Sequence, residues 1–360
     1  MAVFAEEVKL SGYTTLRLGG PARRFVEATT EAELVAAVRA ADDAGERTLV
    51  LGGGSNLVVS DDGFPGTVVH VGTRGTESVP GENGRLLVRA QAGEEWEPFV
   101  ARCVADGLAG IECLSGIPGR VGATPIQNVG AYGQDVSETI VQVRGYDRET
   151  RKVVTLDHAA CRFTYRHSAF KGSDRYVVLD VTYALRESDE SQPVAYAELA
   201  RKLGVEPGAR APLKEVRDAV LELRRGKGMV LDPADPDTRS AGSFFTNPIL
   251  DPAQLADLER RVAGRFGPDA AFPRYAESPA PDGTPRTKTS AAWLIDRAGF
   301  AKGHGTGPAR ISTKHTLALT NPGGGRTADL LALAREVREG VREAFGVEMV
   351  NEPVLVGVHL

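Results

Sequence analysis

The chain has 360 residues, which is too long for one ordinary hydrophobic core and therefore predicts two or three domains. Its composition, with 42% hydrophobic and 25% charged residues, is typical of a globular protein. The formal net charge of -5 argues against a general nucleic-acid-binding protein, because binding to phosphate backbones needs a basic surface. It still allows a small anionic ligand that a few local arginines would hold.

The first ten residues, MAVFAEEVKL, lack the basic and apolar regions of a signal peptide, and no apolar run has the length of a membrane span. The three cysteines, Cys103, Cys113 and Cys161, form no CxxC pair, so neither a disulfide framework nor a zinc site follows from them. His304 and His315 have no carboxylate or cysteine at ligand spacing. We therefore expect a soluble cytoplasmic protein without a metal site.

The first half of the chain mixes helical and strand patterns. Residues 31–45 place apolar side chains on one helical face and end at a glycine. Residues 48–59 are expected to form strand, glycine turn and strand, and residues 67–71 and 86–92 two further strands. A helix is expected over 95–107.

The second half continues the mixture. Strands are expected at 139–146, 152–156 and 176–184, and a helix over 212–228 ends in basic residues and glycine. The Asp-Pro steps of VLDPADPDTRS indicate a domain boundary. Beyond it we expect two helices, near 288–298 and 327–344, a strand at 313–321 and a closing strand in VLVGVHL. This alternation predicts an α+β protein.

Two glycine-rich segments are candidate ligand loops. In LGGGSNL, three glycines allow backbone N–H groups to face an anion, and Ser55 and Asn56 add side-chain donors. The segment matches neither the dinucleotide fingerprint nor the P-loop, and a plain hairpin turn is the alternative. In SGIPGRVGATPIQNVGAYGQ, a long segment nearly free of charge, glycine recurs at every third position from Gly116 to Gly122. Long loops of this kind usually contact ligands.

The segment AGSFFTNP poses a separate question about Ser243. Small residues precede a pair of phenylalanines, so a ligand could approach the hydroxyl. From this segment alone, a serine that caps the end of a strand is the simpler interpretation.

Four motifs in this order, LGGGSNL, GIPGRVGATPIQNVGAYGQ, CRFTYRHSAFK and AGSFFTNP, together resemble the UDP-N-acetylenolpyruvoylglucosamine reductase family. The resemblance extends over nearly the whole chain, and the order of the four motifs makes it specific. It implies reduction of UDP-N-acetylglucosamine-enolpyruvate to UDP-N-acetylmuramate, a step of peptidoglycan synthesis, with FAD as cofactor and NADPH as co-substrate.

The fold that this resemblance implies is α+β. A vanillyl-alcohol-oxidase/PCMH-type FAD-binding fold would contribute two subdomains, and an α+β substrate-binding domain would complete the chain. The expected division is 1–72 with 346–360, then 73–228, then 229–345. We also expect a monomer that binds small molecules, with no nucleic acid and no membrane as partners.

The resemblance also implies residues that hold non-covalent FAD. These are Gly52, Gly53, Gly54, Ser55, Asn56, Leu57, Gly116, Ile117, Pro118, Gly119, Gly122, Ala123, Tyr165 and Arg225. The substrate would contact Tyr132, Tyr196, Lys227 and Asn247. For Arg225 and Lys227 the alternative is a solvated helix end, where cations are favoured. The spacing from Lys227 to AGSFF is also longer than is usual in the family.

Three catalytic residues follow from the resemblance: Arg166, Ser243 and Glu352. A guanidinium can hold the substrate carboxylate and absorb charge that develops beside it. Flavin N5 would deliver hydride to C3, and Ser243 would donate the proton to C2. Glu352 departs from the family pattern because Pro353 follows it, and Glu348 is a competing assignment. The rival functions are another FAD-dependent oxidoreductase of the same fold and a non-catalytic flavin-binding module.

Overall fold

The computed structural model describes residues 5–360 and divides the chain into two compact units. The first unit comprises residues 5–8, Ala22–Gly54 and Phe64–Val230, and the second comprises Lys9–Pro21, Ser55–Gly63 and Leu231–Leu360. Residues 1–4, which belong to the expected first subdomain, lie outside the described residues. The three-domain division stays a prediction.

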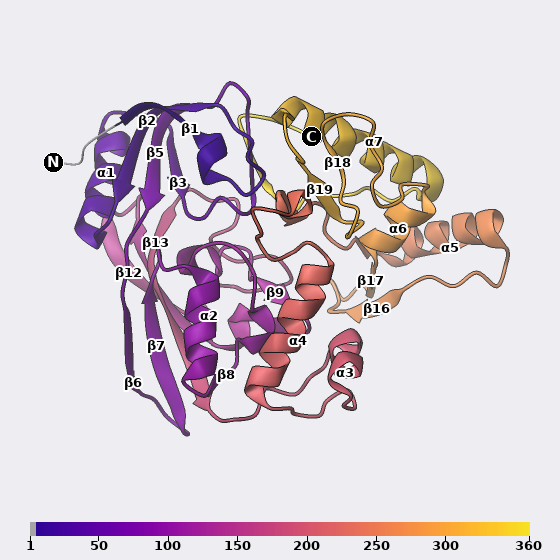
Figure 1. Cartoon of the computed structure of the whole chain (residues 1–360), viewed down its shortest axis with the longest axis horizontal. Helices are drawn as coiled ribbons and strands as arrows, with labels where there is room; N and C mark the ends of the chain where they lie inside the picture. Colours follow the sequence, from indigo (N-terminus) through magenta and orange to yellow (C-terminus); the bar gives the residue numbers. More distant parts are fainter. Residues whose placement is uncertain (1–4) are drawn as a thin grey trace. The chain divides into compact units, whose positions relative to one another are not determined.

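The first sheet of unit 1 is mainly parallel. Its strands, in spatial order, are β1 (Ala5–Lys9), β2 (Pro21–Ala28), β5 (Phe64–Val71) and β3 (Thr48–Leu51). Helix α1 (Glu31–Asp43) connects β2 to β3 and packs against β5 (Figure 1). Thr30 and Glu33 begin this helix with a reciprocal capping box. Parallel β3 and β5 therefore end at the same edge, where the glycine turn begins.

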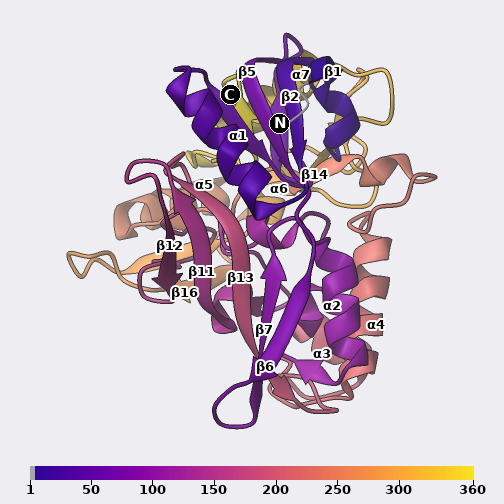
Figure 2. The same cartoon turned by 90° about the vertical axis from the view of Figure 1, so that its left-hand side faces the viewer.

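The second sheet of unit 1 is antiparallel and lies in the sequence beyond β5. Its path is β12 (Lys152–Asp157), β11 (Ile140–Asp147), β13 (Tyr176–Glu187), β7 (Arg85–Gln91) and β6 (Thr76–Pro80), with β8 (Leu108–Ala109) also paired to β13. Helices α2 (Trp96–Ala105) and α4 (Leu213–Gly226) lie side by side, and α3 (Ala197–Leu203) packs on α4 (Figures 1 and 2). Sequence reasoning did not identify α3.

Between these elements, unit 1 contains short 3₁₀ turns and one small hairpin. They are η2 (Glu112–Leu114), η3 (Val121–Ala123), η4 (Val136–Glu138), β9 (Gly130–Ala131) and β10 (Gln134–Asp135). The central core residues, among them Trp96, Phe99 and Tyr183, pack ring against ring. The glycine-rich loop therefore rests on a rigid aromatic cluster.

Unit 2 contains three small sheets and three helices. The strands are β14 (Ser240–Ser243), β19 (Ala318–Thr320) and β18 (Arg310–Ile311) in one sheet, β15 (Ile249–Leu250), β17 (Arg286–Thr289) and β16 (Arg274–Glu277) in the second, and the pair β4 (Leu57–Val59) and β20 (Val354–Val356). The helices are α5 (Pro252–Phe266), α6 (Ala291–Arg297) and α7 (Thr327–Phe345). The unit also has the 3₁₀ turns η1 (Leu10–Tyr13) and η5 (Pro236–Thr238).

Most of the expected helices and strands are present, and three details differ. Unit 2 has a helix that the sequence analysis did not expect, α5, which Asp251 and Gln254 cap reciprocally. The expected strand at 313–321 is only three residues long, because Ser312 accepts hydrogen bonds from the next turn, at Lys314 and His315. Strands β3 and β4 form no hairpin, since β4 pairs in parallel with β20. The closing strand itself is confirmed.

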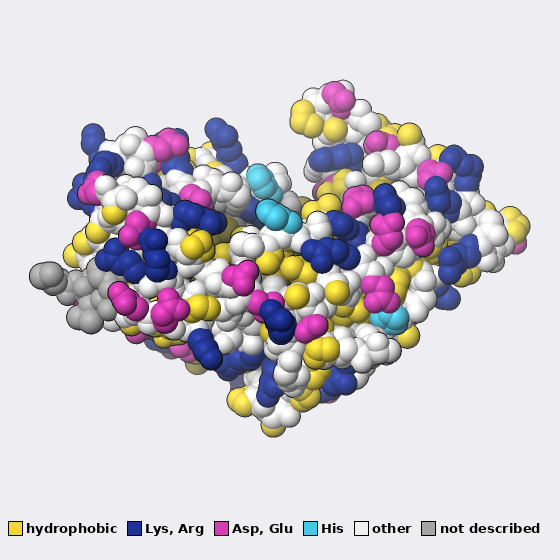
Figure 3. Space-filling model, turned by 90° about the horizontal axis from the view of Figure 1, so that it is seen from above, with side chains coloured by type: hydrophobic (Ala, Val, Ile, Leu, Met, Phe, Trp, Pro, Cys, Tyr) yellow, Lys and Arg dark blue, Asp and Glu magenta, His cyan; other side chains and the backbone are white. Residues whose placement is uncertain are grey.

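One face of the molecule carries charged side chains of both signs (Figure 3). On the face shown in Figure 3, acidic and basic side chains are interspersed and do not gather by sign. Within residues 5–360, no helix combines the length and the apolar character that a bilayer span requires.

Asp147, at the end of β11, has a carboxyl group whose pKa is strongly lowered by its hydrogen-bond partners. Its carboxylate is almost fully buried and accepts hydrogen bonds from Arg175 Nε at 3.0 Å and Nη2 at 2.7 Å, with further bonds from the backbone of the following turn. These donors, with Arg175 first, lower the pKa of Asp147 to about 2. The ion pair therefore stabilises the fold above the ordinary pKa near 4.

We expect Asp147→Asn to lower Tm by roughly 3–6 °C at pH 7, the scale of a lost charge-assisted hydrogen bond in a domain of this size. Because the folded-state pKa is depressed, the difference from wild type should shrink as pH falls from about 4 to 2. Thermal unfolding at a series of pH values measures this. Glu149→Gln, which removes an exposed partner of the same Arg175, is the matched control. A Tm difference that is independent of pH would contradict the assignment.

Candidate active site

The backbones of the two glycine-rich segments lie against each other in unit 1. A Cβ added at Gly53 would lie 2.7 Å from Gly119 Cα, closer than real contacts allow. A Cβ added at Gly52 would meet nothing nearer than 3.6 Å, from Arg120. Gly53 therefore permits the close approach of the two segments, while a Cβ at Gly52 would make only ordinary contacts with Arg120 and Ala123. Such a cradle suits a ligand that backbone N–H groups contact.

The second segment is anchored by helix α2. Trp96 Nε1 donates to Leu114 O at 3.0 Å, and Trp96 N donates to Gly119 O at 3.1 Å. Gly116 has φ +74°, a conformation that favours glycine, and its N–H donates to Glu97. Ile117, Pro118 and Ala123 remain half-buried rather than part of the core. Hydrogen bonds with α2 therefore fix the backbone of the loop, while these three side chains do not pack into the core.

Near this loop, the structure favours a different arginine from the one that the sequence suggested. Arg225 is exposed on α4. Its neighbour Arg224 donates to the carbonyls of Met229 at 2.8 Å and Gly116 at 3.4 Å, and its Nε is buried without a hydrogen-bond partner. Burial lowers the pKa of Arg224 to about 10. Helical spacing from Val216 and Val220 would have placed Arg224 on the buried face.

A further cation beside the glycine turn is Arg120, which sequence reasoning also missed. Its Nη1 donates to Gly93 O at 2.9 Å, and its side chain borders Gly52. Burial lowers the pKa of Arg120. Its position inside the glycine-rich sequence GIPGRVG could have indicated that Arg120 lies beside the candidate ligand loop.

Arg166 is oriented by a set of oxygen acceptors in unit 1. Nη2 donates to Gly130 O at 2.6 Å, and Nη1 donates to Asn128 O at 3.2 Å and to the Asp135 carboxylate at 3.3 Å. Its backbone has φ +52°, and its guanidinium lies 5.1 Å from the ring centre of Tyr165. A Cβ at Gly130 would overlap the Asp135 carboxylate and crowd Arg166 Nη1, so a larger residue there would displace this ion pair. The neighbourhood thus sets the direction of the guanidinium before any ligand binds.

Tyr132, Tyr196 and Lys227 also come together in unit 1. Tyr132 and Gly133 form the two-residue turn of the β9–β10 hairpin with φ +51° and +81°, the pattern of a type I′ turn. The Tyr132 and Tyr196 rings meet edge to face at 5.4 Å, and Lys227 Nζ lies 5.5 Å from the Tyr132 ring centre. Sequence positions almost a hundred residues apart therefore form one cluster.

In unit 2, Ser243 ends strand β14 after a break in strand register. The register against β19 shifts between Ser240 and Ser243, and Gly242 has φ +74°. A bulge of this kind redirects the side chain that follows it. Phe244 and Phe245, each 1% exposed, anchor the chain directly after it. No hydrogen bond to the half-buried Ser243 hydroxyl occurs among residues 5–360, so it is available to a ligand.

The segment before β14 is fixed by buried polar contacts. Asp237 accepts from Thr313 N at 3.1 Å and from the Thr313 hydroxyl, and Arg239 donates to Pro322 O at 2.9 Å. The loop 231–240 therefore joins β14 to the β18–β19 region.

Glu352 lies beside the residue that follows Ser243. Its N–H donates to Phe244 O at 2.8 Å, and its own carbonyl accepts from Asn56 Nδ2 at 3.4 Å. Asn56 O in turn accepts from Val354 N, as Leu57 begins the pairing of β4 with β20. Glu348 instead pairs with Arg338 and is largely exposed. The backbone of Glu352 thus lies next to Phe244, and the choice between Glu352 and Glu348 stays a prediction.

Two remaining candidates have different surroundings. Asn247 Oδ1 accepts from Ala291 N at 2.9 Å at the start of α6, which fixes its carboxamide. Ser55 is half-buried, and no role follows from its contacts. The candidates in unit 1 and those in unit 2 are each ordered by contacts within their own unit.

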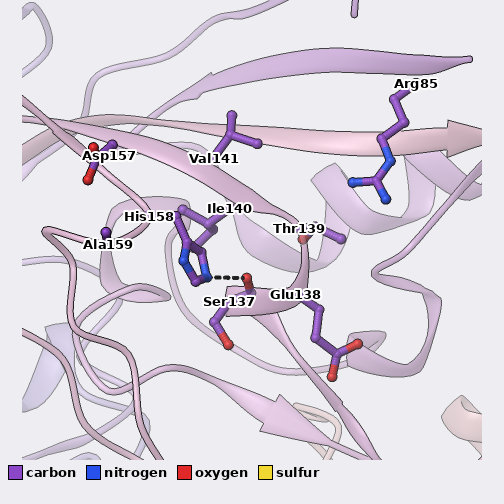
Figure 4. A pocket seen from close by; sticks show the side chains of 9 residues that line it. All are labelled: Arg85, Ser137, Glu138, Thr139, Ile140, Val141, Asp157, His158 and Ala159. Atoms are coloured by element: carbon purple, nitrogen blue, oxygen red, sulfur yellow. Dashed lines mark hydrogen bonds between the residues drawn. The ribbon is translucent and has the colours of Figure 1, made fainter. Parts of the chain in front are cut away.

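A cavity of about 600 Å³ in unit 1 contains none of the candidate residues. It lies between η4, the start of β11 and the end of β12 (Figure 4). His158 Nε2 donates to Ser137 O at 3.1 Å across its wall. Because no candidate residue lines this cavity, it does not identify the reaction site.

The side chains of metal-binding type, including the three thiols, lie among residues 5–360. No group of three or more His, Cys, Asp or Glu side chains there could hold a metal ion. The three cysteines are free and buried, and burial raises the pKa of each thiol, to about 12 for Cys103. These thiols are therefore protonated and inert at neutral pH.

Comparison with known proteins gives consistent results along the chain. Residues 22–156 match the family described as FAD binding domain, and residues 233–356 match the C-terminal domain of UDP-N-acetylenolpyruvoylglucosamine reductase. The chain is 61% identical over 99% of its length to the UDP-N-acetylenolpyruvoylglucosamine reductase of Thermobifida fusca, covering 99% of that protein. It is 61% identical to the enzyme of Streptomyces avermitilis, over 98% of this chain and 95% of that one.

A solved structure supports the fold. The UDP-N-acetylenolpyruvylglucosamine reductase of Thermus caldophilus superposes with a TM-score of 0.66 at 24% identity, over 99% of this chain and 100% of that one. The expected α+β vanillyl-alcohol-oxidase/PCMH-type FAD-binding fold with a further substrate domain is confirmed. FAD is the cofactor, and the turn at Gly52 and Gly53, where neither residue has a side chain that would cover its backbone N–H group, fits a group held by backbone donors.

Gly53→Ala should lower the Tm of the FAD-free protein by several degrees, because the new methyl group would displace the backbone at Gly119. Gly52→Ala, whose Cβ has room in the free protein, should leave that Tm nearly unchanged and weaken FAD retention instead. Differential scanning fluorimetry on FAD-free protein and a titration with FAD separate the two effects. Equal destabilisation by both substitutions would argue against the close approach.

Proposed function

Because this chain belongs to the UDP-N-acetylenolpyruvoylglucosamine reductase family, we propose that it reduces UDP-N-acetylglucosamine-enolpyruvate to UDP-N-acetylmuramate with a proton from Ser243. The family assignment makes the protein an FAD-dependent oxidoreductase with NADPH as co-substrate. It acts on small molecules in peptidoglycan synthesis, and thereby in cell-wall biogenesis, cell shape and cell division. Cytoplasmic location and a monomeric state are part of the proposal.

The observation that carries the mechanism is the geometry around Ser243. A register shift redirects the hydroxyl, two buried phenylalanines fix the backbone after it, and Glu352 is hydrogen-bonded to the next residue. A serine hydroxyl is a weak acid in water, so the site must favour proton transfer from it. Glu352 would do so by orienting the hydroxyl or its proton supply.

Arg166 would bind the carboxylate of the enolpyruvyl group. FAD would supply the hydride when bound, and negative charge would then develop on C2 and the carboxylate of the substrate. A guanidinium already oriented by Asp135 and Gly130 can stabilise that charge without reorganisation. Ser243 then protonates C2 and completes the addition of two hydrogens across the double bond.

The cofactor residues remain as the resemblance assigns them, with one change. Gly52, Gly53, Gly54, Ser55, Asn56 and Leu57 would contact the pyrophosphate of FAD, and the 116–123 loop with Tyr165 would line it from the other side. We propose Arg224, not Arg225, as the guanidinium that faces a ligand, because only Arg224 borders the Gly116 loop. Tyr132, Tyr196, Lys227 and Asn247 would contact the sugar nucleotide.

The function is tested by mixing the purified holoenzyme with NADPH and UDP-N-acetylglucosamine-enolpyruvate. We expect NADPH oxidation that depends on the enolpyruvyl substrate, and a product that mass spectrometry finds two hydrogens heavier. Acid precipitation should leave yellow, non-covalent flavin in the supernatant. NADPH oxidation that the substrate does not stimulate would indicate another flavin oxidoreductase, and no oxidation at all a non-catalytic flavin-binding module.

Ser243→Ala should separate the two half-reactions. Flavin reduction by NADPH needs no proton from Ser243 and should proceed at a near-normal rate. Reoxidation by the enolpyruvyl substrate should slow by roughly 10²–10⁴-fold, the usual contribution of a general acid. Single-turnover stopped flow on each half-reaction measures this.

Ser243→Cys, which keeps an acidic proton, should retain more activity than the alanine variant. Ser240→Ala is the control for strand integrity, since the Ser240 hydroxyl accepts from Gly242 N on the same strand. It should change Tm but leave the ratio of the two rates unchanged. Equal slowing of both half-reactions in Ser243→Ala would make Ser243 structural.

A further inference from the structure

The ammonium group of Lys227 is held from two sides by side chains of unit 1. Its Nζ donates to Glu198 Oε2 at 2.6 Å and lies 5.5 Å from the Tyr132 ring centre. We propose that Glu198 is a positioning residue, which together with Tyr132 directs the remaining donor of Lys227 toward the phosphate groups of a nucleoside-diphosphate ligand. The inference rests on the proposed function and extends it to a residue that does not itself touch the ligand.

The positions of the two charged residues explain their pairing. Lys227 is the C-cap residue of α4, and Glu198 lies in the first turn of α3. A cation is favoured at a helix C-terminus and an anion at a helix N-terminus, so each helix dipole supports its own member of the pair. The pair therefore connects the end of α4 to the segment that begins with Tyr196.

Tyr132 contacts the Lys227 ammonium from a second side and is itself held in a fixed position. It sits at the tip of a two-residue turn at φ +51°, where the hairpin leaves its backbone little freedom. The edge of the Tyr196 ring packs on it, and burial raises the pKa of Tyr132, so the phenol stays neutral beside the ammonium. The face of a neutral aromatic ring attracts a cation without neutralising its charge.

The number of N–H donors on the Lys227 ammonium determines whether it can also bind an anion. An ammonium has three N–H donors. Glu198 takes one, the Tyr132 ring lies beside a second, and one is left for an anion. A flexible lysine loses rotamer freedom when it binds a ligand, and a lysine that is already held loses less. Lys227 and Glu198 are 30% and 36% exposed, so the pair adds little to folding stability and its effect is expected on binding.

A second ion pair joins the same two helices and serves as a matched control. Lys202 of α3 donates to Glu222 of α4, and both side chains are at least as exposed as the Glu198–Lys227 pair. If the only role of Glu198 were to hold α3 on α4, removing the charge of either glutamate would have the same effect.

The experiment compares Glu198→Gln, Glu222→Gln and Lys227→Ala in the FAD-loaded enzyme, with UDP as the probe ligand. We expect isothermal titration calorimetry to show UDP binding that is about five- to tenfold weaker for Glu198→Gln and unchanged for Glu222→Gln. The KM for the enolpyruvyl substrate should rise by a similar factor while kcat stays within about twofold, because the group acts on binding and not on the reacting atoms. Glu198→Asp should recover part of the affinity. Flavin absorbance and Tm establish that each variant is folded.

The outcomes separate this inference from the proposed function. If wild-type enzyme does not bind UDP, the proposed function fails. If wild type binds UDP and Lys227→Ala weakens it, but Glu198→Gln behaves like Glu222→Gln, only the positioning role of Glu198 is overturned. Tighter UDP binding by Glu198→Gln would also overturn it, since Glu198 would then compete with the phosphate groups for Lys227.

Discussion

The close approach of the backbone at Gly53 to the backbone at Gly119 is the constraint on which the site in unit 1 depends. It brings the end of a parallel strand against a loop that Trp96 holds from the other side. Side chains at the contact would separate the two segments and would occupy the space where backbone donors are needed. The aromatic core under the loop therefore serves a local purpose, because it keeps a glycine-rich backbone in one conformation that its own residues could not maintain.

In unit 2 the backbone around a candidate residue is also fixed, but by a register shift and buried phenylalanines. Ser243, the proposed proton donor, lies between a register shift at Gly242 and the buried Phe244, which together fix its backbone. The final strand then returns from the other end of the sequence and pairs with β4, which carries Glu352 to Phe244. A mobile hydroxyl would make a poor proton donor, because its orientation would have to be selected anew in each turnover.

The sequence predicted the strong periodic elements and the order of the motifs, but not the long-range pairings. Helix α4 followed from a segment that ends in basic residues and glycine, and the spacing of its apolar residues, had it been followed to position 224, would have distinguished Arg224 from Arg225. The Asp251-Pro252 cap and the apolar positions Leu258 and Val262 would have predicted α5 as well, which the sequence analysis missed. In contrast, local residues carry no information that β4 pairs with β20, because that register depends on packing between segments almost three hundred residues apart.

Backbone strain provides an independent indication of where function is concentrated in unit 1. Among residues 5–360, eight non-glycine residues have positive φ, and Asn128, Tyr132 and Arg166 are three of them. Such conformations cost free energy and persist where the surrounding structure enforces them, which is common at binding sites. The Asn128 carbonyl accepts from Arg166, and Tyr132 borders Lys227, so the strained residues belong to the two clusters already assigned to ligand binding. Because folding fixes these side chains, less ordering remains to oppose the binding of a charged ligand.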